Sequence, residues 1–135
     1  MVIGRNDHRA GGTLGAMTFG LHHVQLAIEP GSEDRCRAFY VGVLGLTEIP
    51  KPPALAGRGG LWLRTGGLEL HLGVEPGFRP ARKAHPGILA DDLDALADRL
   101  HRHGAEVEWD DGFPGHRRFY THDCLGNRLE FLSPA

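Results

Sequence analysis

Histidine and glutamate recur at matching places in the two halves of this 135-residue chain. His23 and His85 lie 62 residues apart, and Glu69 and Glu130 lie 61 residues apart. Imidazole nitrogens and carboxylate oxygens together bind divalent transition metals, and such an ion polarises a carbonyl or stabilises an enolate. We therefore predict one divalent metal ion (Ni, Co, Zn, Mn or Fe) held by these four residues. Glu130 and Glu69 are the candidate catalytic residues, because a carboxylate that leaves the ion can move a proton.

The first half of the chain is predicted to hold one helix and four strands. Acidic residues after Ser32 suit the start of a helix, with the Ser32 side chain as its cap, and Gly45 ends it. Alternating apolar residues bounded by turn residues indicate the strands. They are expected at 21–28, 46–49, 61–64 and 67–73, with a Pro/Gly-rich loop at 50–60.

The same order of elements returns in the second half. Asp91 or Asp92 caps a helix that ends at Gly104, and residues 123–126 form the turn of the last hairpin. The strands are expected at 85–90, 106–109, 117–121 and 127–132. A duplicated βαβββ unit predicts an α+β domain with a pseudo-twofold axis, in which equivalent strands of the two halves face a shared cleft.

Strand alternation indicates which side chains share a face. The aliphatic residues of each strand are expected to pack under the helices, which leaves His23, Glu69 and Glu130 on the opposite, concave face. His85 opens its strand at the position equivalent to His23. Three further polar residues share the concave face and are predicted to contact the ligands or the substrate: Gln25, His71 and Arg128.

Three other residues have structural places in this interpretation. His22 is expected to pack or cap on the helix side of its strand. Cys36 lies on the apolar stripe of the first helix and is expected in the core, whereas Cys124 is expected in an exposed turn. Two cysteines are too few for a disulfide scaffold and suit a reducing cytosol.

Length and charge narrow the class of protein. The chain has 15 Lys and Arg against 17 Asp and Glu, a net charge of −2, which argues against nucleic acid as a partner. No run approaches the roughly 18 apolar residues of a membrane span, and no secretory signal is visible, so we expect a cytoplasmic protein. The length fits one domain at 19–135 after a flexible tail at 1–18. Its modules are expected at 19–75 and 84–133.

Five segments resemble the vicinal oxygen chelate superfamily, which includes glyoxalase I, fosfomycin and bleomycin resistance proteins, and extradiol dioxygenases. They are LHHVQLAI at 21–28, RAFYVGVLGL at 37–46, LELHLGVE at 68–75, HPGILADDLDAL at 85–96 and HDCLGNRLEF at 122–131. The resemblance implies two tandem βαβββ modules that form a curved mixed sheet around a metal cleft, commonly in a homodimer.

The resemblance also implies a ligand set. The family's usual ligands correspond to His23, His85 and Glu130, and glyoxalase I-like members add a fourth at the position of Glu69. His71, two residues further on the same face, is the alternative fourth ligand. Two departures from the family pattern are Pro86 directly after His85 and Cys124 where the hairpin turn usually carries proline.

These observations predict an enzyme of the glyoxalase type, a lyase or isomerase that acts on a small oxygenated substrate by metal-assisted proton abstraction. With His23, His85 and Glu130 alone, the alternatives are a non-haem Fe(II) ring-cleaving dioxygenase or an antibiotic-modifying thiol transferase. A metal-free small-molecule binding protein of the bleomycin-resistance kind is the non-enzymatic alternative. The loop before His85 carries Arg79, Arg82 and Lys83. These cations are either a solvated charge run or a lip that binds an anionic substrate group, with Arg58 and Arg64 as helpers.

Overall fold

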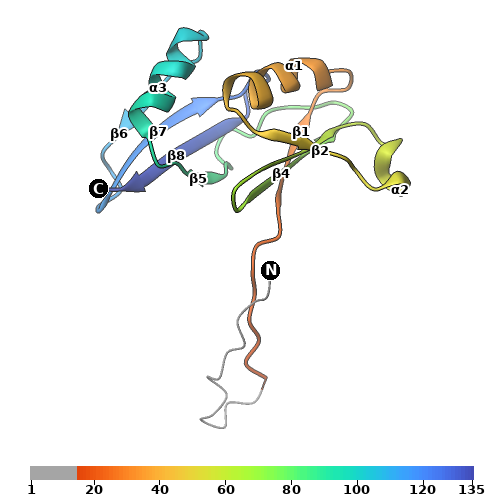
Figure 1. The fold of residues 1–135 in the computed structure, drawn as a ribbon, viewed down its shortest axis with the longest axis horizontal. Coiled ribbons are helices and arrows are strands. Elements are labelled where there is room, and N and C mark those ends of the chain that lie inside the picture. The colour runs from red at the N-terminus through yellow and green to blue at the C-terminus, as the bar shows by residue number, and fades with distance from the viewer. Residues whose placement is uncertain (1–14) are drawn as a thin grey trace.

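The computed structural model describes residues 15–135, in two modules of the same βαβββ order (Figure 1). Most of the predicted tail at 1–18 lies outside the described residues. The two-module α+β fold predicted from the sequence is confirmed, with its strands in two four-stranded mixed sheets. No helix within residues 15–135 combines the length and apolar character that a bilayer crossing requires.

The first module forms a sheet of order β1-β4-β3-β2, in which β1 and β4 are parallel. Its first helix, α1 (Glu33–Arg37), continues directly into a π-helical turn, η2 (Ala38–Val43). A short helix, α2 (Pro53–Ala56), lies in the loop before the β3–β4 hairpin. The strands are β1 (Val24–Ile28), β2 (Thr47–Ile49), β3 (Leu61–Thr65) and β4 (Leu68–Val74).

The second module repeats this arrangement with the order β5-β8-β7-β6, and β5 and β8 are parallel. Its helix is α3 (Leu93–Arg102), which Asp92 caps by accepting a hydrogen bond from the Ala95 amide at 3.0 Å. The strands are β5 (Gly87–Leu89), β6 (Glu108–Asp110), β7 (His116–His122) and β8 (Arg128–Pro134).

Three local expectations need correction. The Ser32 side chain does not cap α1, because the Ser32 backbone (φ −97°, ψ 6°) is not in the extended conformation typical of a capping residue; its hydroxyl donates to the Glu29 carbonyl at 2.6 Å instead. The expected loop at 50–60 contains α2, which begins at Pro53. A backbone amide in the first turn has no hydrogen-bond acceptor within the helix, so proline is tolerated there. The strand expected at 21–28 begins only at Val24, since β4 pairs with it from that residue onward.

Both principal helices lie on the same side of the sheets, where one hydrophobic core joins the two modules (Figure 1). The turn between β7 and β8 reaches the first module: Tyr40 donates to Asp123 at 2.7 Å, and the Asn127 side chain donates to the Ala27 carbonyl at 2.9 Å. No helix of residues 15–135 covers the opposite faces of the sheets, and these faces carry the predicted site residues.

Candidate functional site

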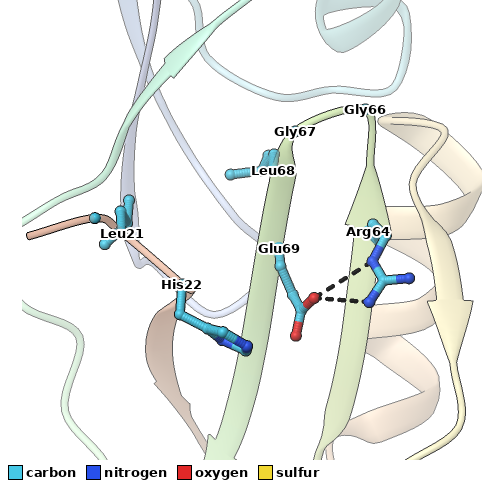
Figure 2. A pocket seen from close by; sticks show the side chains of 8 residues that line it. Leu21, His22, Arg64, Gly66, Gly67, Leu68 and Glu69 are labelled. Atoms are coloured by element: carbon cyan, nitrogen blue, oxygen red, sulfur yellow. Dashed lines mark hydrogen bonds and ion pairs between the residues drawn. The ribbon is translucent and has the colours of Figure 1, made fainter. Parts of the chain in front are cut away.

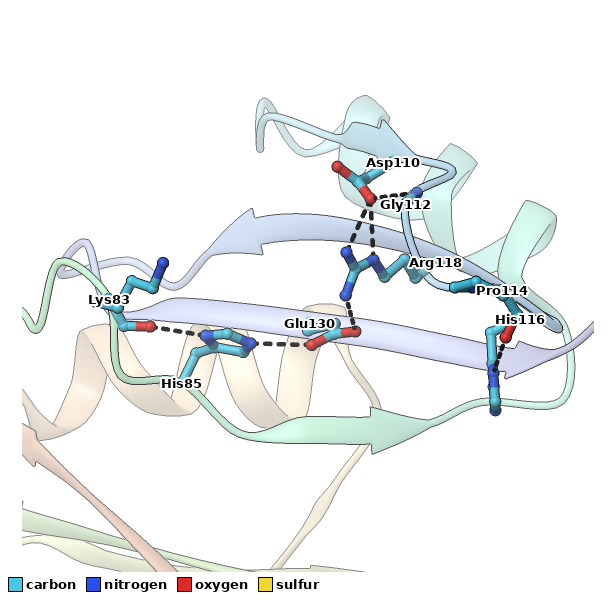
Figure 3. A network of polar contacts seen from close by, with 8 residues as sticks. All are labelled: Lys83, His85, Asp110, Gly112, Pro114, His116, Arg118 and Glu130. Carbon is cyan, nitrogen blue, oxygen red and sulfur yellow. Dashed lines mark hydrogen bonds and ion pairs between the residues drawn. The ribbon is translucent and has the colours of Figure 1, made fainter.

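His85 and Glu130 meet on the uncovered face of the second sheet (Figure 3). The His85 Nε2 lies 2.9 Å from Oε1 of Glu130, and Glu130 is only 6% exposed. Parallel pairing of β5 with β8 aligns Gly87 with Glu130, and the Glu130 amide donates to the Pro86 carbonyl at 3.1 Å. Pro86 therefore extends the backbone pairing by its carbonyl and holds His85 beside Glu130.

The two nitrogens of His85 have different partners. Nδ1 lies 2.8 Å from the backbone carbonyl of Lys83, which can only accept a hydrogen bond. Nδ1 must therefore carry a proton, and in the neutral ring Nε2 presents a lone pair. That lone pair faces the Glu130 carboxylate, so the contact is favourable only with a cation at Nε2, either a second proton or a metal ion.

An arginine holds the second oxygen of Glu130. Arg118 Nη1 donates to Oε2 at 3.3 Å, and Nη2 of the same guanidinium donates to Asp110 at 2.9 Å. The Gly112 amide and then Arg118 lower the pKa of Asp110, and the pairing with Asp110 raises the pKa of Arg118. Asp110 thus fixes the guanidinium, and the guanidinium leaves Oε1 of Glu130 as the oxygen turned toward His85.

Tyr120 completes this side of the site. It is the direct cross-strand neighbour of Glu130, and its ring meets the His85 ring edge to face at 5.5 Å. The guanidinium groups of Arg118 and Arg128 lie 5.2 and 4.1 Å from the centre of its ring. Arg128, predicted as a contact residue, therefore lies in this cluster through Tyr120. We call His85, Glu130, Arg118 and Tyr120 the second half-site.

On the first sheet, both oxygens of Glu69 are already paired, and Figure 2 shows the pairing of one of them with Arg64. Arg64 donates to Oε1 at 2.9 Å, and His71 Nε2 donates to Oε2 at 2.7 Å. The hydrogen bond from His71, followed by that from Arg64, lowers the pKa of Glu69 to about 2. A carboxylate this acidic is a weak proton acceptor near neutral pH.

Three aromatic rings stack beside this carboxylate. The His71 ring lies between Trp62, at 4.0 Å and 4°, and His23, at 3.9 Å and 17°. His71 is 4% exposed, so the stack and Glu69 together fix its position. Desolvation, then His71 and His22, lower the pKa of His23. We call His23, Glu69 and His71 the first half-site.

The predicted ligands are therefore brought together in two groups. Within residues 15–135 of one chain, no three His, Cys, Asp or Glu side chains gather closely enough to hold one metal ion. His85 and Glu130 form one pair, and Glu69 and His71 form the other, with His23 stacked on His71. The four-residue site stays a prediction, and in a single chain its two halves are not joined.

Other predicted residues take different places. His22 does not pack on the helix side: it is exposed, with Nδ1 2.9 Å from Nδ1 of His23, because the chain leaves the sheet before Val24. Gln25 lies exposed on the predicted face, over Gly73. The loop cations of residues 79–83 are exposed, and their role toward an anionic substrate stays a prediction.

A hollow of about 500 Å³ opens at one end of the first half-site (Figure 2). Of the predicted ligands, Glu69 alone lines it. The remaining walls come from the segment before β1 and from the β3–β4 hairpin: Gly20, Leu21, His22, Arg64, Gly66, Gly67 and Leu68.

Trp62, Arg118 and Tyr120 are absent from the sequence-based site. A signal was available for two of them, because antiparallel pairing places Trp62 opposite His71 and Tyr120 opposite Glu130. Opposite residues on neighbouring strands point to the same face. The hairpin lengths needed for this register could be read from the turns, whereas the Arg118 contact depends on side-chain reach.

Comparisons with known proteins assign the chain to a family. The profile of the Glyoxalase/Bleomycin resistance protein/Dioxygenase superfamily matches residues 20–131. A glyoxalase family protein from Bacillus anthracis is 42% identical, with a TM-score of 0.85 over 89% of this chain and 98% of that chain. No curated protein matches the chain at a significant level.

Two more distant structures share the fold. A mutant of the fosfomycin resistance protein FosX from Listeria monocytogenes, complexed with Mn(II) and 1S,2S-dihydroxypropylphosphonic acid, is 18% identical. Its TM-score is 0.71 over 88% of this chain and 95% of that chain. TnmS3, an antibiotic binding protein from Streptomyces sp. CB03234, is 21% identical, with a TM-score of 0.66 over 87% of this chain and all of that chain. Since the family model matches residues 20–131, most of its length, this chain belongs to the Glyoxalase/Bleomycin resistance protein/Dioxygenase superfamily.

Proposed function

We propose that this protein is a divalent-metal-dependent enzyme of the glyoxalase type, whose metal site is completed by two copies of the chain. The observation that carries the proposal is the arrangement of His85. Its Nδ1–H is directed to the Lys83 carbonyl, and its Nε2 lone pair is directed toward the Glu130 carboxylate. Metal-binding histidines in proteins usually donate their other N–H to a carbonyl or carboxylate in this way.

The donor set fits a metal ion. Two neighbouring ligand atoms around an octahedral ion, at bonds of about 2.1 Å, lie about 3.0 Å apart. The His85 Nε2 and Glu130 Oε1 are 2.9 Å apart, so both can bind one ion with little movement. Arg118 would keep Oε2 of Glu130 occupied and thereby turn Oε1 toward the ion.

The proposed reaction uses Glu130 as the proton carrier. When bound, the ion would supply a Lewis acid that stabilises negative charge on a substrate oxygen. Glu130 Oε1 would leave the ion and take the proton from the carbon next to the substrate carbonyl, while Arg118 still holds Oε2. Glu69 suits this step less well, because the hydrogen bonds from His71 and Arg64 keep its pKa at about 2. We assign it to positioning His71 instead.

A second copy of the chain would bring the half-sites together. The outer edges of β1 and β5 are unpaired with any strand of the described residues. The segment before β1 runs away from both sheets and exposes 86% of Phe19 and 74% of Leu21 (Figure 1). Apolar side chains this exposed on an extended segment favour a partner surface. We propose a homodimer in which His23 of one chain joins His85 and Glu130 of the other.

Two other activities fit the same metal site in part: a ring-cleaving dioxygenase and an antibiotic-modifying thiol transferase. With Glu69 engaged by Arg64 and His71, the ligands left are His23, His85 and Glu130, the set that non-haem Fe(II) dioxygenases use. An iron-selective site that consumes oxygen would favour that activity. FosX, which has the same fold, is complexed with Mn(II), and this supports a metal site here. It does not decide between a lyase or isomerase, a dioxygenase and a thiol transferase.

A metal-free binding protein is the second candidate function. The stacked rings of Trp62, His71 and His23 form a flat aromatic surface that suits an aromatic ligand. TnmS3, an antibiotic binding protein, shares the fold. This function predicts tight binding of an aromatic compound by protein that takes up no metal.

The experiment measures the metal content of gently purified, full-length protein by ICP-MS, before and after incubation with each candidate ion. We expect near-stoichiometric metal in the wild type and its loss in His85→Ala. His101→Ala is the matched control, because His101 is an exposed histidine in the last turn of α3, away from both half-sites. Wild-type protein that takes up none of the ions, or His85→Ala protein that keeps its metal, would overturn the proposal.

A further inference from the structure

The chain's two cysteines lie in contact although 88 residues separate them in sequence. The Sγ of Cys36, in α1, is 3.8 Å from the Sγ of Cys124, in the turn between β7 and β8. Both are free thiols. The sequence placed Cys124 in an exposed turn, but the turn folds against the first module and is half-buried there. The contact therefore joins the two modules.

Two hydrogen bonds keep the turn in this place. Tyr40 donates to Asp123, the residue next to Cys124, at 2.7 Å, and the Asn127 side chain donates to the Ala27 carbonyl at 2.9 Å. Asp123 also accepts from the Leu125 and Asn127 amides, both at 2.9 Å, which makes the turn rigid. The approach of the two sulfurs is thus set by the backbone and does not depend on one flexible side chain.

We propose that Cys36 and Cys124 are a reversible oxidation site, at which a low-molecular-weight disulfide converts the two thiols into a disulfide between the modules. An S–S bond is about 2.05 Å long, so the sulfurs must approach by about 1.8 Å. Cys124 lies outside the strand pairing of β7 and β8, so rotation about its side-chain bonds can supply this movement while the turn stays in place.

The exchange begins at Cys124. Its side chain is partly exposed, whereas Cys36 is fully buried and out of reach of a reagent. The hydrogen bond to Cys36 and burial raise the pKa of the Cys124 thiol, so this first step is expected to be slow. The Cys124 thiolate attacks one sulfur of the reagent, the reagent's S–S bond breaks, and one thiolate leaves and takes up a proton. The Cys36 thiolate then attacks the Cys124 sulfur of the mixed disulfide and releases the second thiol. Two protein thiols are oxidised, and one reagent disulfide is reduced to two thiols.

In the reduced protein the contact also favours the thiolate form of Cys36. The hydrogen bond from Cys124 lowers the pKa of the Cys36 thiol, because the neighbouring S–H stabilises its thiolate. Ser32 Oγ, 3.9 Å from the same sulfur, acts in the same direction. In the mixed disulfide Cys124 no longer carries this S–H, so the Ser32 contact and the position of Cys36 beside the Cys124 sulfur favour attack by Cys36 over attack by a second reagent molecule.

The test treats reduced, full-length protein with oxidised glutathione and maps its peptides without reduction. We expect the peptides that contain Cys36 and Cys124 to be joined, both thiols to be lost, and the intact mass to fall by two hydrogens. Dithiothreitol should restore both thiols. The oxidised protein should melt at a temperature at least about 5 °C higher, since the bond closes a long loop.

Single variants provide the controls. Cys36→Ser should keep a stable glutathione adduct on Cys124, because no second thiol can displace it. Cys124→Ser should leave the buried Cys36 unmodified in the folded protein. Wild-type protein that accumulates a persistent glutathione adduct, or forms its disulfide only between two chains, would overturn the proposal. The peptide map of the wild type decides this even if a variant fails to fold.

Discussion

Oε1 of Glu130 lies 2.9 Å from Nε2 of His85, although 45 residues separate them in sequence. Parallel pairing of β8 with β5 creates this contact, and the Lys83 carbonyl fixes which nitrogen of the ring faces the carboxylate. The equivalent histidine of the first module, His23, has no such contact with Glu69 and stacks on His71 instead. The duplicated sequence therefore builds two unlike half-sites.

Arg118→Gln should weaken metal binding without abolishing it. Arg118 touches Glu130 and not the proposed ion, so we expect a loss of affinity of about 10–100-fold, as is usual for residues that orient a ligand. Competition titration with a metal indicator measures this. Arg117→Gln is the control, since the neighbouring Arg117 pairs with Asp94 in α3 on the other face. Equal losses in both variants would contradict the role given to Arg118.

Glu69→Gln should keep a stoichiometric metal ion. In the wild type, the carboxylate requires the proton of His71 to be on Nε2, while an amide can also donate and so no longer fixes the tautomer. We expect ¹⁵N NMR of the His71 ring to report an increased Nδ1–H population. Loss of the metal from Glu69→Gln would instead identify Glu69 as the fourth ligand.

Mixing two inactive variants tests the shared site. If His23 of one chain joins His85 of the other, a heterodimer of His23→Ala and His85→Ala chains has one intact site and one site that lacks both histidines. Random mixing of equal amounts should therefore restore about one quarter of the wild-type metal content. A site formed within one chain predicts no recovery on mixing, which ICP-MS and sedimentation velocity together would show.

Tyr40→Phe should destabilise the protein by about 1–2 kcal/mol, because Asp123 loses a buried donor. Burial and then the Asp123 carboxylate raise the pKa of Tyr40 well above its ordinary value of 10.0. The folded state thus holds this proton more tightly than the unfolded chain does. The stability that it contributes is complete below about pH 10 and is lost as the pH rises above that value.

Urea unfolding between pH 7 and pH 11 measures both effects. The wild type should lose stability in the alkaline range, and Tyr40→Phe should show a smaller decline. Tyr120→Phe is the matched control, because it changes the only other tyrosine of the chain. An identical alkaline decline in Tyr40→Phe and the wild type would contradict the assignment to Tyr40.

The sequence by itself determined the modules, the principal helices and the faces of the strands. Apolar periodicity, the Asp92 cap and the glycines Gly45 and Gly104 are local signals, and the structure bears out the elements that they predict. Alternation also placed Glu130 and His71 correctly on the faces away from the helices. These features depend on neighbours within a few residues, which any single sequence displays.

Only the tertiary structure decided what those side chains contact. Alternation gives the face of Glu69, but the partners of its two oxygens follow from the register of the β3–β4 hairpin and the reach of Arg64. Likewise, no local pattern in the sequence indicates a partner for Cys124, and only the packing of the modules brings it to Cys36. Such contacts join residues that are distant in sequence, and their geometry depends on how whole elements pack, which periodicity does not encode.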